Sequence, residues 1–182
     1  MKLSDADILI IPGLHNSGPG HWQQRWAEKM RTASIVEQAD FDDPDPEDWV
    51  DAIVKAVELA ERPVVIVAHS LGCIAVAKAA AQLTDGKVKG ALLVCPPDVY
   101  RDNAPEAVRD FAPLPRDPLP FPSLLVASST DFYCALETAA DLAGAWGSEF
   151  HNAGEAGHIN LDSGHGPWPE GLMMFTRLMQ RI

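Results

Sequence analysis

The chain has 182 residues and carries 26 acidic against 14 basic side chains, which gives a formal net charge of −12 at pH 7. This length suffices to bury a sizeable core, so we expect a single domain over residues 1–182 that needs no metal or disulfide for stability. Because the chain is acidic and has no basic run, we expect it to bind neither nucleic acid nor an anionic membrane surface.

At the N-terminus, residues 1–7 lead into only a short apolar run at residues 8–11. We therefore expect no signal peptide and no membrane span, and a cytoplasmic protein. The run itself predicts a buried strand, which Pro12 and Gly13 close before a glycine-rich loop that extends to Gly20. Neither phosphate-binding pattern fits this loop, since it lacks both Gly-Lys-Ser/Thr and the glycine spacing of the dinucleotide fingerprint.

Three further elements precede the centre of the chain. Apolar residues at four-residue steps predict a helix over residues 22–30, and a weaker apolar run predicts an edge strand over residues 34–38. A second helix is expected from Pro46, because Asp45 is a favourable N-cap and proline is favoured at the first helical position. Pro63 ends that helix.

The next stretch carries the strongest functional signal. Residues 64–68 are all apolar and mostly β-branched, which predicts a strand buried on both faces, and Ser70 stands in a sharp turn before a helix of small residues. This pattern is typical of a nucleophile elbow, which lifts a serine hydroxyl above a parallel sheet. Ala68 and Gly72 suit the crowded turn, although the usual pattern has glycine at both positions. The alternative is that Ser70 simply caps a packed helix.

Residues 90–95 predict another buried strand, and residues 96–122 contain eight of the chain's 15 prolines. That density permits little regular structure beyond a short helix near residues 105–111. Long irregular segments in compact domains are usually disordered or functional. This one has enough apolar side chains to pack down as a cover over other parts of the molecule; they are Val99, Tyr100, Phe111, Leu114 and Leu119.

The remaining elements complete an alternating pattern. Residues 124–128 and 149–151 predict strands, with a helix over residues 133–145 between them, and a terminal helix begins near Trp168, with one apolar side formed by Leu172, Phe175, Met179 and Ile182. Strands that alternate with helices indicate an α/β fold, here a three-layer sandwich around a mostly parallel sheet of about six strands. A strand order of 2-1-3-4-5-6 would bring the first loop opposite Ser70 across the binding crevice.

A serine nucleophile needs a base, and the base needs an acid that orients it. In elbow folds the chain order is serine, acid, histidine. Asp131 and His158 both follow strands in that order, so we predict a hydrolytic triad of Ser70, Asp131 and His158. Of the competing groups, Asp141 lies within a helix and His151 within a strand. Asp98 comes too early in the chain, and His165 lies farther along the same loop as His158. Asp162, four residues beyond His158, is the alternative acid.

The same reasoning places the groups around the triad. The backbone N–H of Leu71 is one expected oxyanion donor, and that of Leu14, directly after Pro12 and Gly13, is the expected second. His15 and His21 share no ligand spacing with another His, Cys or acid, so we expect no metal. His15 instead is expected to line the mouth of the crevice.

Two aromatic side chains near the triad loops are candidates for the substrate pocket. Tyr133 and Trp168 could wall it, although core packing explains either equally well. The three cysteines, Cys73, Cys95 and Cys134, have no paired spacing and lie in apolar or helical surroundings. We expect them to be reduced core thiols rather than disulfides or ligands.

Five stretches give the chain a family resemblance: residues 12–22 (PGLHNSGPGHW), 69–73 (HSLGC), 128–131 (SSTD), 154–160 (GEAGHIN) and 166–171 (GPWPEG). With them the chain resembles the small serine hydrolases related to retinoblastoma-binding protein nine, within the α/β-hydrolase superfamily. The resemblance implies a compact hydrolase without a lid domain or a metal, and it implies the same triad. One departure is Phe132, where many relatives have proline after the acid.

These observations together predict a serine hydrolase that needs no cofactor. We expect it to cleave small acyl esters or related carboxyl derivatives through a covalent acyl-serine. Two alternatives stay open. The same site could act on an amide or a thioester, or the fold could serve as a protein-interaction module with little turnover. The sequence does not identify protein partners, and the intact set of Ser70, Asp131 and His158 argues against a pure binding module.

Overall fold

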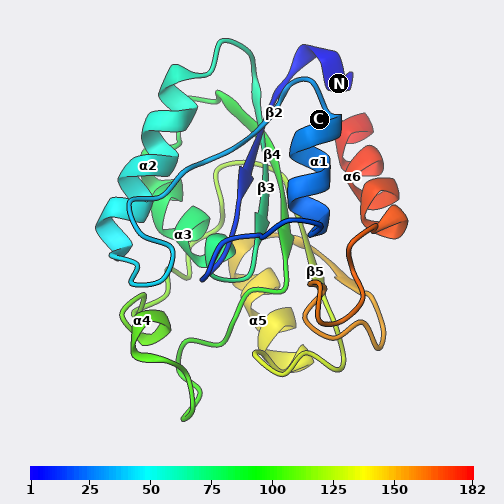
Figure 1. Ribbon diagram of the computed structural model, residues 1–182. Coiled ribbons are helices and arrows are strands. Elements are labelled where there is room, and N and C mark those ends of the chain that lie inside the picture. The colour runs from blue at the N-terminus through cyan, green and yellow to red at the C-terminus, as the bar shows by residue number, and fades with distance from the viewer.

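Figure 1 shows the computed structural model, which describes residues 1–182. A six-stranded sheet forms its middle layer, with β1 (Asp7–Ile11), β2 (Ala33–Ile35), β3 (Val64–His69), β4 (Val88–Val94), β5 (Ser123–Ala127) and β6 (Glu149–Asn152). The strands lie in the order β2-β1-β3-β4-β5-β6, and every neighbouring pair is parallel. This arrangement confirms the predicted α/β class, and its strand order is the one expected to bring the first loop opposite Ser70.

Both faces of the sheet are buried, as the side chains of β3 show. Val64, Ile66 and Ala68 belong to one hydrophobic core, and Val65 and Val67 belong to a second core on the opposite face. Successive side chains of a strand point to opposite faces, so a strand covered on both sides must be apolar throughout. The continuous apolar run that predicts this strand therefore reflects its central place in the sheet.

Helices cover the two faces and make the molecule a three-layer sandwich (Figure 1). The first core includes side chains of α2 (Pro46–Leu59), α3 (Leu71–Ala79) and α5 (Leu136–Trp146). The second includes side chains of α1 (Trp22–Lys29) and α6 (Pro169–Arg181). Single-turn 3₁₀ helices occupy Leu3–Asp5 and Ala80–Gln82. No helix combines the length and the apolar character that crossing a lipid bilayer requires.

The proline-rich segment between β4 and β5 contains one short helix, α4 (Glu106–Arg109), and no separate lid domain. Val99 and Phe111 are fully buried in the first core, where the Phe111 ring packs against Trp49 at a centroid distance of 5.6 Å. Tyr100 is exposed instead, and its hydroxyl accepts a hydrogen bond from the backbone N–H of Leu114 at 2.9 Å. The segment thus packs on the molecule largely as its apolar content predicts.

Several expected boundaries and faces are wrong. The edge strand β2 is shorter than predicted, and α5 begins at Leu136 rather than at residue 133, because the backbone N–H of Tyr133 bonds the Asp131 carboxylate at 2.9 Å. In α6, Leu172 is 43% exposed although its spacing suggests burial. The helix buries Phe175 and Met179 as predicted, and it buries Met174 and Leu178 beside them.

Candidate active site

Ser70 lies between β3 and α3 with an unusual backbone conformation. Its φ of 54° and ψ of −128° lie in a region that L residues rarely adopt, so the turn is strained. The strain is held by close packing behind the turn. A Cβ added at Gly72 would lie 2.5 Å from the carbonyl oxygens of Ile11 and Pro12, which explains why this position has no side chain.

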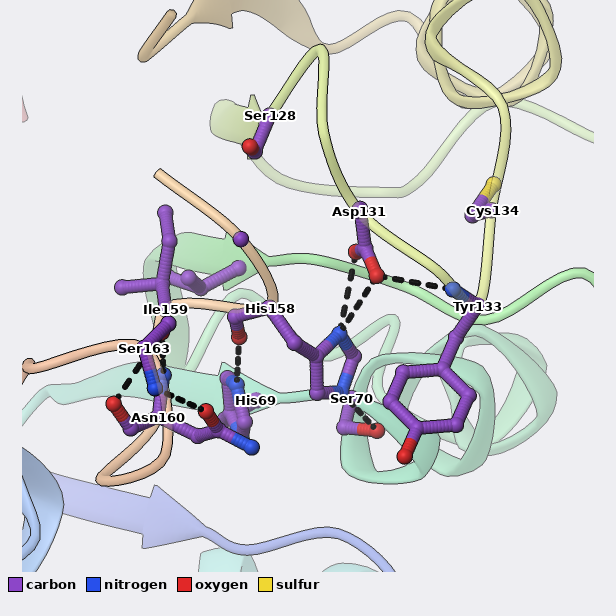
Figure 2. Close-up of polar contacts among 12 residues, drawn as sticks. His69, Ser70, Ser128, Asp131, Tyr133, Cys134, His158, Ile159, Asn160 and Ser163 are labelled. Carbon is purple, nitrogen blue, oxygen red and sulfur yellow. Dashed lines mark hydrogen bonds and ion pairs between the residues drawn. The ribbon is translucent and has the colours of Figure 1, made fainter. Parts of the chain in front are cut away.

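Three side chains from distant parts of the chain meet at this turn (Figure 2). The Nε2 atom of His158 lies 2.9 Å from Ser70 Oγ, and its Nδ1 atom lies 2.9 Å from both carboxylate oxygens of Asp131. The side chains of His158 and Asp131 are only 10% and 2% exposed. The structure therefore brings together the serine, histidine and acid that the sequence singles out, in one hydrogen-bonded chain.

The loops that carry Asp131 and His158 are bound to each other by side-chain hydrogen bonds. Ser128 Oγ donates to the Gly154 carbonyl and accepts from the Ala156 N–H, both at 3.0 Å. Thr130 Oγ1 accepts from the Gly157 N–H at 3.0 Å. Because these bonds join the loop after β5 to the loop after β6, they fix the acid relative to the base.

Two further histidines lie beneath His158 and were not predicted as site residues. His69 Nε2 donates to the backbone carbonyl of His158 at 2.9 Å, and the rings of His21 and His69 are 5.1 Å apart. Burial, followed by the nearby charge of His158, lowers the pKa of His69 well below its usual range. The same two causes lower the pKa of His21 to about 4. Both rings are therefore neutral at pH 7. The imidazole that contacts Ser70 is that of His158.

The loop after β1 packs directly against the serine. A Cβ added at Gly13 would lie 2.8 Å from Ser70 Cβ and 3.1 Å from the backbone nitrogen of Leu71. The N–H of Leu14 has no hydrogen-bond partner in the protein, and that of Leu71 lies at the N-terminus of α3, where helical N–H groups are free. Two backbone donors thus flank Ser70 at the expected positions.

A pocket of about 420 Å³ opens at Ser70, and its lining includes His15 and Tyr133 as expected. Trp168 does not line it, which corrects the second aromatic candidate: this ring is 4% exposed and packs against Trp22 at a centroid distance of 4.9 Å. One wall of the pocket is not predicted from the sequence: the proline-rich segment supplies it through Pro97, Arg101, Pro105 and Val108.

The competing acids and histidines have other partners or none near the serine. Asp141 pairs with Arg116 at 2.8 Å on the surface, and His165 Nδ1 lies 3.1 Å from Ser163 Oγ. Asp162 lies on the rim of the pocket and is exposed, and no hydrogen bond joins it to His158. Asp131 is therefore the acid that contacts the base.

One cluster near the site has the atom types of a metal site. Sγ of Cys95, a carboxylate oxygen of Asp131 and a ring nitrogen of His158 lie within 4.8 Å of one another. Burial, followed by the charge of Asp131, raises the pKa of the Cys95 thiol well above its usual range, so the sulfur stays protonated. Since His158 and Asp131 already bond each other, this cluster suits proton transfer better than metal ligation. All three cysteines are free thiols.

The parallel sheet in this strand order, with a serine in a strained turn after β3, defines an α/β-hydrolase fold. The chain belongs to the serine hydrolase family, because the model of that family matches residues 8–177. This match covers nearly the whole chain, and it supports the resemblance to the small serine hydrolases that the sequence motifs indicate.

Solved structures agree with this assignment. A YdeN-like hydrolase from Pectobacterium atrosepticum is 30% identical and superimposes with a TM-score of 0.85 over 97% of this chain and 92% of that chain. The ydeN gene product of Bacillus subtilis is 20% identical, with a TM-score of 0.71 over 95% of this chain and 98% of its own. An esterase domain from Rhodothermus marinus is 17% identical, with a TM-score of 0.64 over 95% of this chain and 87% of its own. It shows the shared fold. Among curated proteins, none shows significant similarity to this chain.

Proposed function

We propose that this chain is a carboxylic ester hydrolase that cleaves small acyl esters through a covalent acyl-serine, with Ser70, His158 and Asp131 as its triad. The observation that carries the proposal is the continuous hydrogen-bonded chain from Ser70 Oγ through His158 to the Asp131 carboxylate. Neighbouring Leu14 and Leu71 N–H groups add the donors that acyl transfer requires.

The first half of the reaction follows from these contacts. Asp131 accepts the Nδ1–H of His158, which leaves Nε2 free to take the proton of Ser70 Oγ. The oxygen then attacks the ester carbonyl carbon, and the carbonyl oxygen becomes an oxyanion. The N–H groups of Leu14 and Leu71 stabilise that charge. Collapse of the intermediate expels the alcohol, which receives its proton from His158, and the acyl group stays on Ser70.

The second half repeats these steps with water as the nucleophile. His158 removes a proton from the water, which attacks the acyl carbon, and the second oxyanion uses the same two donors. When this intermediate collapses, His158 returns a proton to Ser70 Oγ and the carboxylic acid is released. The pocket of about 420 Å³ is at the small end of the range for ligand sites, which supports a small substrate.

The test is a series of p-nitrophenyl esters of increasing acyl length, measured for the wild type and for Ser70→Ala. We expect the wild type to prefer short acyl groups, and we expect Ser70→Ala to lose all turnover above background. A matched p-nitroanilide and a matched thioester separate ester cleavage from amidase and thioesterase activity. Wild-type rates no higher than those of Ser70→Ala across every substrate would refute the proposal and favour a module with little turnover.

A further inference from the structure

Arg101 is a cation in the wall of the pocket that the triad does not use. It belongs to the irregular segment between β4 and α4, and its side chain lines the same pocket as Ser70 and His158. The chain as a whole carries a net charge of −12, so a positive group beside the serine is not a consequence of general composition.

Aromatic packing fixes the position of this guanidinium. Its central carbon, Cζ, lies 4.9 Å from the centroid of the Tyr133 ring and 5.7 Å from that of Phe132. Tyr133 also contacts the base, because the rings of Tyr133 and His158 are 4.5 Å apart. Figure 2 shows the Tyr133 ring beside Ser70 and His158. One aromatic ring therefore contacts both the guanidinium and the imidazole.

The hydrogen-bonding capacity of Arg101 is mostly unused within the protein. Its Nη1 donates to Asn103 Oδ1 at 3.1 Å, whereas its Nε–H is closed off from solvent and meets no acceptor. None of the five ion pairs of the protein involves Arg101, so no carboxylate lies within 4.0 Å of it. A guanidinium has five N–H donors in a planar fork that suits a carboxylate.

The other charges on the pocket lining do not neutralise this group. Asp162 is the one carboxylate of the lining, and it is exposed on the rim. Asp131 lies behind His158 and is bonded to it. The remaining ionisable groups of the lining are the Tyr133 hydroxyl and four histidines, of which His15 bonds Asp42 at 2.8 Å. An anion that enters the pocket therefore meets Arg101 as its one unpaired cation.

We propose that the preferred substrate carries a carboxylate a few bonds from the ester carbonyl, and that Arg101 binds that carboxylate. This inference rests on the proposed function, because it names the substrate class of the same site. Stacking on Tyr133 and Phe132 holds the fork in place before the substrate arrives, which lowers the entropy lost on binding. Half-esters of short dicarboxylic acids have the required chemistry, and so do esters whose alcohol carries the carboxylate.

The experiment compares kcat/KM for two esters of similar shape, the p-nitrophenyl half-ester of glutaric acid and p-nitrophenyl pentanoate. The wild type should favour the half-ester relative to the neutral ester. Arg101→Gln should lower this ratio by about 10- to 100-fold, the usual effect of losing a hydrogen bond to a charged group. Arg101→Lys should retain part of the preference, since it keeps the charge but not the fork. A second substrate, an ester whose leaving alcohol carries the carboxylate, shows whether Arg101 binds the acyl part or the alcohol part.

Arg109→Gln is the matched control, because Arg109 is exposed in α4 of the same segment and does not line the pocket. It should keep the wild-type ratio. An equal ratio in the wild type and in Arg101→Gln, with both esters hydrolysed, would overturn the inference and leave the proposed function standing.

A binding measurement separates the two proposals if turnover is absent. Ser70→Ala should bind the glutarate half-ester, monitored by calorimetry, and the double variant with Arg101→Gln should bind it about 10-fold or more weakly. Weaker binding in the double variant supports carboxylate recognition even if the wild type hydrolyses no ester. Equal binding in both proteins overturns it.

Discussion

The two sides of the active site are built in different ways. On the nucleophile side, backbone packs on backbone: the loop at Gly13 contacts the turn at Ser70, and Gly72 lies against the carbonyl groups of Ile11 and Pro12. On the acid–base side, loops after β5 and β6 are joined by side-chain hydrogen bonds, among them those of Ser128. Added atoms should therefore impair the nucleophile side and lower activity. On the acid–base side, activity should fall when polar atoms are removed.

The largest expected effect is on the acid. Asp131→Asn keeps the size of the side chain, but the amide can hold His158 in the tautomer that cannot take the Ser70 proton. The same change costs on the order of 10⁴ in kcat in the serine protease template, and we expect a loss of that order here. Asp162→Asn, four residues beyond His158, should lose far less. The test is to measure kcat for ester hydrolysis by both variants after confirming that each folds. A large loss in Asp162→Asn and a small one in Asp131→Asn would identify Asp162 as the acid.

An added methyl group tests the nucleophile side. In Gly13→Ala the new Cβ would meet Ser70 Cβ at 2.8 Å, so the loop must move and carry the Leu14 N–H away from the oxyanion. Loss of one such donor lowers kcat by about 10²–10³. Gly144→Ala is the control, since a Cβ there meets nothing within 4 Å. Unchanged kcat in Gly13→Ala would show that the close packing does not position the donor.

The buried histidines between the two sides make stability depend on pH. The pKa of His21 is about 4 in the folded chain, because of burial and then the charge of His158, and about 6.5 when the chain unfolds. Below pH 6.5 the unfolded chain binds the extra proton and the folded chain does not, so stability falls as the pH drops toward 4.

The matched variant is His21→Asn, which does not titrate but can still accept the hydrogen bond that His21 Nδ1 receives from the Gln23 N–H at the start of α1. Urea unfolding at pH 7 and pH 5 should show the wild type losing about 2 kcal/mol more than this variant. Equal losses in the two proteins would show that His21 is not the titrating group.

The smallest expected effect comes from one polar atom on the acid–base side. Ser128→Ala removes the hydroxyl that joins the two loops, which should lower the free energy of unfolding by about 1 kcal/mol and kcat by about tenfold. Ser129→Ala is the control, because the Ser129 side chain makes no such bond. If Ser128→Ala and Ser129→Ala have the same free energy of unfolding and the same kcat, side-chain hydrogen bonds do not hold the acid against the base.

The triad and the wall of the pocket that contains Arg101 differ in how far sequence alone predicts them. The strands themselves, the turn at Ser70 and the places of Asp131 and His158 after strands all follow from local apolar runs and chain order. Arg101 does not, because a long irregular segment brings it to the pocket and no periodicity marks it. For Trp168 the structure favours the core-packing alternative over a place in the pocket wall, and for Leu172 the predicted burial is wrong. Both outcomes depend on tertiary packing around one end of α6, which local spacing does not encode.

Covalent labelling of the serine is the measurement that tests the account most directly. A fluorophosphonate probe reacts with a serine whose hydroxyl a neighbouring base activates, and peptide mapping by mass spectrometry locates the adduct. We expect one adduct, on Ser70, which disappears in Ser70→Ala while that protein keeps its fold by circular dichroism. Equal labelling of the wild type and Ser70→Ala would contradict the account, because the activated nucleophile would then be a different residue.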